Sequence, residues 1–306
     1  MRKLGAWIRI IRLQFYPMTF MAYCLGAVWA WRMDGVFHGP SFFWGYGVLF
    51  LMELATVIAN ECWDIETDRA NRNFSAFTGG SRVLPEGLLS RREALAGLLS
   101  SLCLLAGAAG VLALRVQPGG WRSGAAVLAG VVLGLGYTVP PLRLVYRGLG
   151  EAMVGFTHSF YVILCGWLFQ RGSLSGCGSL AAAGLPLFLA VTASICLAGI
   201  PDRTADSSVD KRTLAVLLGS RRAALLASAL TALALAAGLA VPSSGFNSGS
   251  LSWLAWPAAC HGGLVLALTG RFLASGDYDR PINPLMAASL SYILWFAAVP
   301  LAFAWP

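Results

Sequence analysis

Nine long apolar segments run along this chain, and they constrain its fold more than any other feature. Each is close to the roughly 20 residues that a helix needs to cross a bilayer, and clusters of Gly, Pro, Ser and charged residues separate them. The segments lie at approximately 13–33, 41–61, 93–114, 123–139, 149–169, 179–200, 222–241, 252–273 and 285–304. Only 12% of the 306 residues are charged, about half of the usual share in a globular chain. The sequence therefore predicts an all-α membrane protein, a single domain over 1–306 with nine transmembrane helices.

Basic residues are divided unevenly between the two ends of these predicted helices. Of the 22 Lys and Arg residues, all but Arg32, Arg115, Arg122 and Arg171 fall on the side of the N terminus. Because Lys and Arg concentrate in cytoplasmic loops, we expect a cytoplasmic N terminus and an outer C terminus, in a bacterial inner (plasma) membrane. Positive charge spread between apolar segments forms no basic patch, which argues against nucleic acid as a partner.

Acidic residues cluster at the ends of two predicted helices. Charge is costly in a membrane, so this clustering is informative. The first cluster reads NECWDIETD, and within it Asn60, Asp64 and Asp68 recur at steps of four. That spacing puts the three on one face if the helix continues through the stretch. The second cluster reads DRTADSSVD, with Asp202 and Asp206 at the same step.

The two acidic clusters fall on the same side of the predicted bundle, because four spans separate their helices. A single DxxxD step is more simply a solvated helix end, but two on one side favour a site. Carboxylates brought together repel one another unless a cation neutralises them. Mg²⁺ is the natural cation, since it takes oxygen ligands and commonly bridges carboxylates to substrate phosphates. Basic residues that would contact such a diphosphate are Arg69, Arg72, Arg82, Lys211 and Arg212.

With these motifs the chain resembles the UbiA superfamily of intramembrane prenyltransferases, whose members carry NDxxDxxxD in a first loop, DxxxD in a second, and nine spans. Further similar stretches lie at 80–90, 136–151 and 211–219. They look most like the 1,4-dihydroxy-2-naphthoate polyprenyltransferases of menaquinone biosynthesis. The chain departs from the pattern at Glu61, where relatives usually have Asp, and at Ala198, where many have Asn.

The resemblance implies Mg²⁺-dependent transfer of a polyprenyl group from its diphosphate to an aromatic acceptor, 1,4-dihydroxy-2-naphthoate or a related quinone precursor. The reaction would take place in a central cavity open to the lipid bilayer. Asp64, Asp68, Asp202 and Asp206 would be catalytic, and with Asn60 they would bind the metal. An allylic cation needs a dry cavity with aromatic faces, and most of the aromatic residues lie within predicted spans.

Four further residues are candidates for contact with the acceptor or the diphosphate: Tyr137, Arg143, Arg147 and Glu53. The two arginines would otherwise be basic anchors of a cytoplasmic loop. A carboxylate within a span, such as Glu53, is a functional candidate by default, with a hydrogen-bonded structural role equally open. His158 is interpreted as a packing residue.

Two alternatives stay open from the sequence. A membrane terpene cyclase of the same fold would use the same carboxylates and need no acceptor. A cation-coupled transporter would also place acids within the membrane. Against the transporter, both acidic clusters lie at helix ends on one side and not at mid-membrane.

Overall fold

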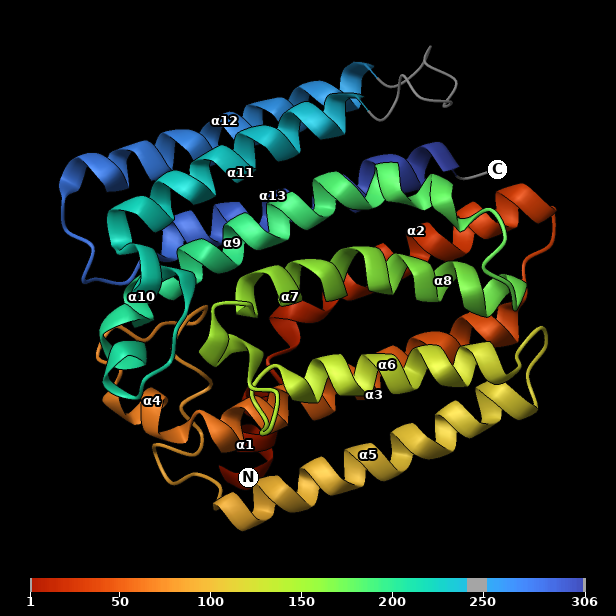
Figure 1. The fold of residues 1–306 in the computed structure, drawn as a ribbon, viewed down its shortest axis with the longest axis horizontal. Helices are drawn as coiled ribbons and strands as arrows, with labels where there is room; N and C mark the ends of the chain where they lie inside the picture. Colours follow the sequence, from red (N-terminus) through yellow and green to blue (C-terminus); the bar gives the residue numbers. More distant parts are fainter. Residues whose placement is uncertain (1, 241–251, 305–306) are drawn as a thin grey trace.

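All regular secondary structure in residues 2–240 and 252–304, the part of the chain that this computed structural model describes, is helical, and no β-strand occurs in those two ranges (Figure 1). The helices are α1 (Arg2–Ile11), α2 (Tyr16–Asp34), α3 (Gly39–Trp63), α4 (Ile65–Ala70), α5 (Arg91–Leu114), α6 (Trp121–Gly136), α7 (Gly150–Phe156), α8 (Val162–Arg171), α9 (Leu180–Ser208), α10 (Leu214–Leu218), α11 (Ser220–Ala240), α12 (Ser252–Ser275) and α13 (Asn283–Ala304). A π-helical turn, η3 (Thr157–Tyr161), joins α7 to α8. Short 3₁₀ turns occupy Leu13–Phe15, Leu144–Arg147 and Cys177–Ser179.

A helix occupies most of each of the nine predicted apolar segments. Six helices in the described ranges are long and apolar enough to cross a membrane: Gly39–Trp63, Arg91–Leu114, Gly150–Arg171, Cys177–Ser208, Ser220–Ala240 and Asn283–Ala302. At 16 residues, α6 is about 24 Å long, shorter than the roughly 30 Å hydrocarbon core. The chain is therefore an integral membrane protein of helices, and the count of nine spans stays a prediction.

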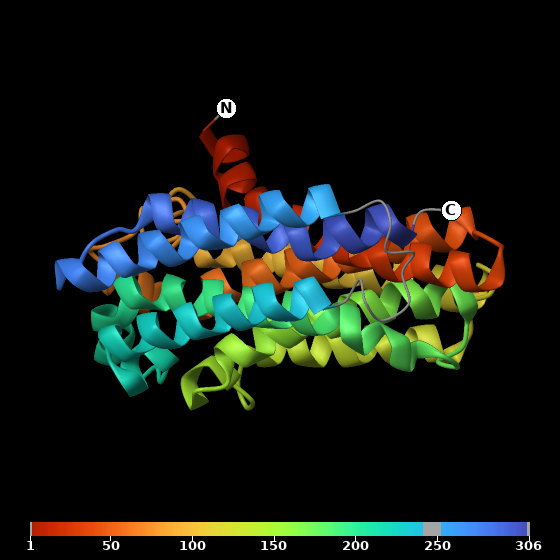
Figure 2. The ribbon, with the colours of Figure 1, turned by 90° about the horizontal axis from the view of Figure 1, so that it is seen from above.

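The long helices run side by side along one axis, while α1 crosses that direction at the N terminus (Figure 2). The most extensive contacts join α9 to α11, α2 to α8, and α3 to α5. Small residues permit these approaches, as in other membrane bundles. A side chain at Gly26 of α2, for example, would collide with the backbone carbonyl of Ile163 in α8.

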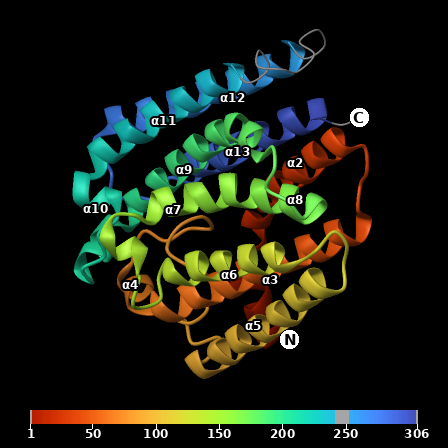
Figure 3. The same cartoon turned by 45° about the vertical axis from the view of Figure 1, so that its right-hand side comes forward.

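Both acidic motifs lie at one end of the bundle, at the left in Figure 1 and again in Figure 3. There α3 leads into α4, and α9 leads into α10, while α4 contacts α9 directly. The loop from 71 to 90 also lies at this end. Two segments far apart in the sequence are thereby brought together.

Candidate active site

A cavity of about 290 Å³ opens between the helices at the acidic end of the bundle. All five residues predicted as metal ligands line it: Asn60, Asp64, Asp68, Asp202 and Asp206. Farther in, the walls are mostly apolar and come from several helices, with Met18, Leu133, Val154, Val191 and Ile293 among them. The cavity thus has a charged end and a hydrocarbon-like interior.

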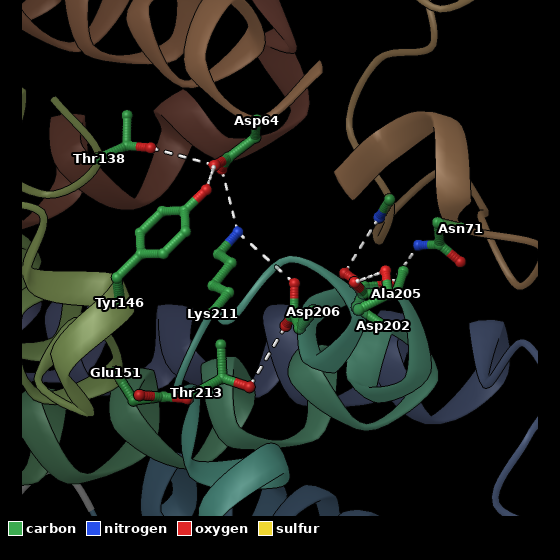
Figure 4. Close-up of polar contacts among 12 residues, drawn as sticks. Asp64, Asn71, Thr138, Tyr146, Glu151, Asp202, Ala205, Asp206, Lys211 and Thr213 are labelled. Carbon is green, nitrogen blue, oxygen red and sulfur yellow. Dashed lines mark hydrogen bonds and ion pairs between the residues drawn. The ribbon is translucent and has the colours of Figure 1, made fainter. Parts of the chain in front are cut away.

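Lys211 joins the two acidic motifs (Figure 4). Its Nζ lies 3.0 Å from Oδ2 of Asp64 and 3.6 Å from Oδ1 of Asp206. Only 8% of Lys211 is exposed. Burial by itself would lower the pKa of the ammonium group, but the carboxylates of Asp64 and Asp206 raise that pKa well above its usual value. A positive charge is therefore held between the two motifs.

Hydrogen-bond donors from other segments fix the same carboxylates. Oδ1 of Asp64 accepts from the hydroxyls of Thr138, at 3.1 Å, and Tyr146, at 3.3 Å. Oδ2 of Asp206 accepts from the Thr213 hydroxyl at 3.2 Å. These donors lie outside both motifs, and sequence reasoning missed them because a hydroxyl in a loop has no distinctive spacing.

The helix does not continue unbroken through the first motif. α3 ends at Trp63, and Asp64, with φ −95° and ψ 10°, separates it from α4. The backbone bonds nevertheless keep a step of four, because the Asp64 amide donates to the Asn60 carbonyl at 2.8 Å and the Asp68 amide to the Asp64 carbonyl at 2.9 Å. Asn60, Asp64 and Asp68 all reach the cavity from the two sides of this bend.

Asp68 is a buried carboxylate of the first motif. It is 7% exposed, and burial raises its pKa to about 8, with the nearby carboxylates of Glu61 and Asp64 adding to the shift. Gly80, at φ +70°, leaves room for it, since a side chain there would collide with the Asp68 carboxylate. Glu61 also lines the cavity, and its carboxylate accepts from both the amide and the hydroxyl of Ser81, at 2.7 and 2.5 Å.

The second motif is tied to the loop that follows α4. Asn71 Nδ2 donates to Oδ1 of Asp202 at 2.7 Å, and the Gly79 amide donates to Oδ2 at 3.2 Å (Figure 4). Asn71 is buried. It lies just beyond the first motif, where the spacing of the acidic residues gives no signal for an amide partner of Asp202.

The donor set at this end suits a hard divalent cation. Oδ1 of Asn60 is buried and accepts no hydrogen bond from the described residues, and the carboxylates already hold one cationic side chain between them. Within residues 2–240 and 252–304, no three acidic, His or Cys side chains are close enough together to hold a metal by themselves. Mg²⁺ commonly takes only one or two carboxylates and fills its other positions with water and substrate phosphate oxygens, so the residues fit it.

Three predicted phosphate contacts lie on the outside. Arg69 is paired with Glu66 at 2.9 Å, and its side chain is 53% exposed. Arg72 and Arg212 are also exposed. None of these three described arginines lines the cavity.

Of the remaining predicted residues, two line the cavity and three make contacts within the loops at this end. Arg82 donates to the backbone carbonyl of Asp68 and lies over the Phe74 ring, 4.4 Å from its centroid. Arg143 lies 3.6 Å from the centroid of the Tyr146 ring. Arg147 donates to the Pro141 carbonyl at 2.9 Å. By contrast, the two other candidates line the cavity: Tyr137 and Glu53.

Arg12 lines the cavity although its position suggested only a basic residue near the N terminus. It has φ +56°, at the turn between α1 and the 3₁₀ turn before α2, and its Nη2 donates to the Phe77 carbonyl at 3.4 Å. That reversal of the chain points the side chain toward the acidic end, which no local pattern indicates.

Fold and site together define a membrane protein of helices whose cavity has an acidic end suited to a hard cation. Residues 19–291 match the UbiA prenyltransferase family, and the chain belongs to that family. The resemblance drawn from the two motifs is confirmed.

Similar proteins include one curated relative and several solved structures. Over 176 residues the chain is 28% identical to the 2-carboxy-1,4-naphthoquinone phytyltransferase of Synechocystis sp., and the match spans 55% of this chain and 52% of that protein, about half of its length. The apo structure of a UbiA homologue from Aeropyrum pernix K1 superposes with a TM-score of 0.65 at 18% identity, covering 92% of this chain and 95% of that one. A UbiA homologue from Archaeoglobus fulgidus bound to GPP and Mg²⁺ gives a TM-score of 0.59 at 15% identity, with 97% and 98% covered. At these identities the structural likeness shows the fold alone.

Proposed function

We propose that this protein transfers a polyprenyl group from its diphosphate to an aromatic acceptor, with Mg²⁺ as cofactor, and that the acceptor is 1,4-dihydroxy-2-naphthoate or a related quinone precursor. The observation that carries the proposal is the meeting of two acidic motifs, joined by Lys211, at one end of an otherwise apolar cavity. Family membership supports the reaction class. The Synechocystis relative, a phytyltransferase named for a carboxynaphthoquinone, supports the acceptor class. The GPP and Mg²⁺ bound to the A. fulgidus homologue support the donor and the metal.

The acidic end would bind the diphosphate. Mg²⁺ held by Asn60, Asp64, Asp68, Asp202 and Asp206 would neutralise the diphosphate and stabilise the charge that develops on it as the allylic C–O bond breaks. Lys211 and Arg12 line the same cavity and would contact the phosphate oxygens directly. The exposed arginines Arg69, Arg72 and Arg212 would attract the anionic substrate from outside, as a surface charge does.

The inner walls would hold the prenyl chain and exclude water. Apolar side chains of α9 and α13, such as Val191, Ile195 and Leu290, line that part of the cavity. A dry site prevents water from capturing the allylic cation before a ring carbon of the acceptor attacks it. Tyr137 also lines the cavity, and the face of its aromatic ring would stabilise the cation.

A direct assay tests this function. Purified protein, Mg²⁺ and a labelled polyprenyl diphosphate should yield a decarboxylated prenyl naphthoquinol when 1,4-dihydroxy-2-naphthoate is present. A hydrocarbon product formed without acceptor would instead identify a terpene cyclase. No consumption of diphosphate with any acceptor would overturn the proposal and favour a transporter.

We further propose nine spans in a bacterial inner membrane, with the N terminus and the acidic end in the cytoplasm. The division of basic residues between the two sides supports this orientation. A reporter fused to the C terminus should then be active outside the cytoplasm. Activity of that fusion in the cytoplasm would contradict the orientation.

A further inference from the structure

The cavity continues inward into a second, smaller one of about 70 Å³. The two share five wall residues: Glu53, Thr56, Gly134, Thr157 and His158. Glu53 precedes Asn60 by seven residues on α3, which corresponds to about 10 Å along the helix. That distance leaves room for the first carbons of a prenyl chain and one aromatic ring between the diphosphate and this inner end.

Glu53 places a carboxyl group at the inner end, within a membrane-spanning helix. Its Oε2 is buried and accepts no hydrogen bond of ordinary geometry from the described residues, and the hydroxyl of Thr19, which lines the same smaller cavity, likewise has no partner of that kind. A buried carboxyl oxygen without a donor is unfavourable. A ligand that brings a hydroxyl group to this point would remove the penalty.

His158 presents a second hydrogen-bond acceptor to the same space. Its Nδ1 lies 3.0 Å from the backbone carbonyl oxygen of Val154. A carbonyl oxygen only accepts, so Nδ1 carries the hydrogen of the neutral ring, and Nε2 is left with a lone pair. Nε2 can therefore accept a hydrogen bond from a ligand donor.

A π-helical turn holds His158 in this orientation. The turn spans Thr157–Tyr161 and interrupts the regular bonding between α7 and α8. Side chains bond the nearby carbonyls: the Thr157 hydroxyl donates to Met153 at 2.9 Å, and the Ser159 hydroxyl donates to Gly155 at 2.6 Å. Single π turns within helices are frequent at functional sites, and this one brings two successive polar residues, Thr157 and His158, to both cavities.

We infer that Glu53 and His158 are specificity-determining residues that bind the hydroxyl groups of a reduced aromatic diol and reject the corresponding quinone. The inference rests on the proposed function, whose acceptor it specifies by oxidation state. A diol ring brings hydroxyl donors to two acceptors, whereas a quinone brings only carbonyl oxygens. Sites built around such hydrogen bonds discriminate strongly, because the wrong ligand leaves buried polar groups unpaired.

Equilibrium binding tests the inference without catalysis. The ligands are 2,3-dimethyl-1,4-naphthoquinone, whose substituted ring carbons do not add cysteine thiols, and its reduced diol. Each is titrated anaerobically into the purified full-length protein, with neither Mg²⁺ nor diphosphate present. Wild type should bind the diol at least about tenfold more tightly than the quinone.

Two variants and two matched controls complete the test. Glu53→Gln replaces an acceptor oxygen with an amide donor, so it should weaken diol binding and strengthen quinone binding. His158→Phe removes Nε2 and should weaken diol binding alone. The same changes at Glu86, which is paired with Arg9 outside the cavity, and at His38, which lies outside both cavities, should leave both affinities unchanged.

Each result either supports or overturns the roles inferred for Glu53 and His158. Equal affinity of wild type for diol and quinone would overturn the inference, as would folded Glu53 and His158 variants that keep the wild-type preference. Selective diol binding by a wild type that consumes no prenyl diphosphate would support the inference and overturn the proposed function. The two failures are therefore distinguishable.

Discussion

The two ends of the cavity differ in how their polar groups are satisfied. At the acidic end, carboxylates meet donors from distant segments, as Asp64 does with Tyr146 and Asp202 with Asn71. At the inner end, Oε2 of Glu53 has no donor among residues 2–240 and 252–304. The carboxylates of Asp64 and Asp202 are fixed by the protein itself, with Oδ1 of Asn60 left for a cation, whereas the inner end leaves a hydrogen bond for a ligand to make.

This difference follows from the charges that each end would accommodate. A diphosphate with its metal develops charge during reaction, and fixed groups stabilise such charge without having to reorganise. A dihydroxy aromatic ring brings its own hydroxyl donors, so unpaired acceptors at this end suffice to orient it. Variants at the acidic end should therefore affect every reaction of the prenyl diphosphate, and variants at the inner end should affect the choice of acceptor.

The largest effect is expected from Asp64→Asn. Loss of this carboxylate removes the shared partner of Lys211, Thr138 and Tyr146, together with a proposed metal ligand. We expect a fall in kcat/KM of roughly 10³, measured as prenyl product, and loss of diphosphate cleavage without acceptor as well. Asp277→Asn, at an exposed surface pair, is the control. An Asp64 variant that keeps half of the wild-type rate would contradict the proposal that the acidic end binds the metal and stabilises the charge on the diphosphate.

Lys211→Met should destabilise the metal-free protein. Removing one partner of a buried charge pair typically costs about 3–5 kcal/mol, and here it would leave two carboxylates facing each other. Thermal unfolding in detergent measures the loss. Added Mg²⁺ should restore part of the melting temperature, because a divalent cation replaces the missing charge.

The matched control is Lys3→Met, which breaks a pair whose lysine side chain is 71% exposed and should cost no more than about 1 kcal/mol. Lys211→Met with an unchanged melting temperature would show that the acidic end does not depend on an internal cation.

Asn71→Ala should have a smaller effect on turnover. It removes the 2.7 Å bond to Asp202, and a hydrogen bond to a charged group contributes about 1.5–3 kcal/mol. We expect a loss in kcat/KM on the order of tenfold for the prenyl diphosphate. Asn73→Ala, whose amide contacts Asp279 and the Pro201 carbonyl, keeps the Asp202 bonds and should stay near wild type. Equal losses in the two variants would point to loop folding and not to the orientation of Asp202.

Sequence patterns predicted much of the fold because hydropathy is a local property. Apolar segments predicted the helices, and the steps of four predicted side chains that now line one cavity at Asn60, Asp64, Asp68, Asp202 and Asp206. The bend at Asp64 was not anticipated, yet the backbone bonds on both sides of it keep the step.

Contacts between distant segments could not be predicted from these local sequence patterns. Asn71, Arg12 and His158 carry no motif, and each reaches the site through a turn or a packing arrangement that only the folded chain defines. Proximity along the chain also misled, because Arg69 follows the first motif directly but its side chain points away from the cavity toward Glu66.

Arg69→Gln should accordingly have the smallest effect, a change in kcat/KM of less than about twofold, because exposed pairs contribute little and salt screens their field over roughly 8 Å. Arg12→Gln provides the comparison, since the same change at a cavity-lining position removes a proposed phosphate contact and should raise KM for the diphosphate. If Arg69→Gln cost as much as Arg12→Gln, α4 would have to turn inward when the diphosphate binds. The acidic end would then be reorganised by its ligand, and the contrast with the inner end would disappear.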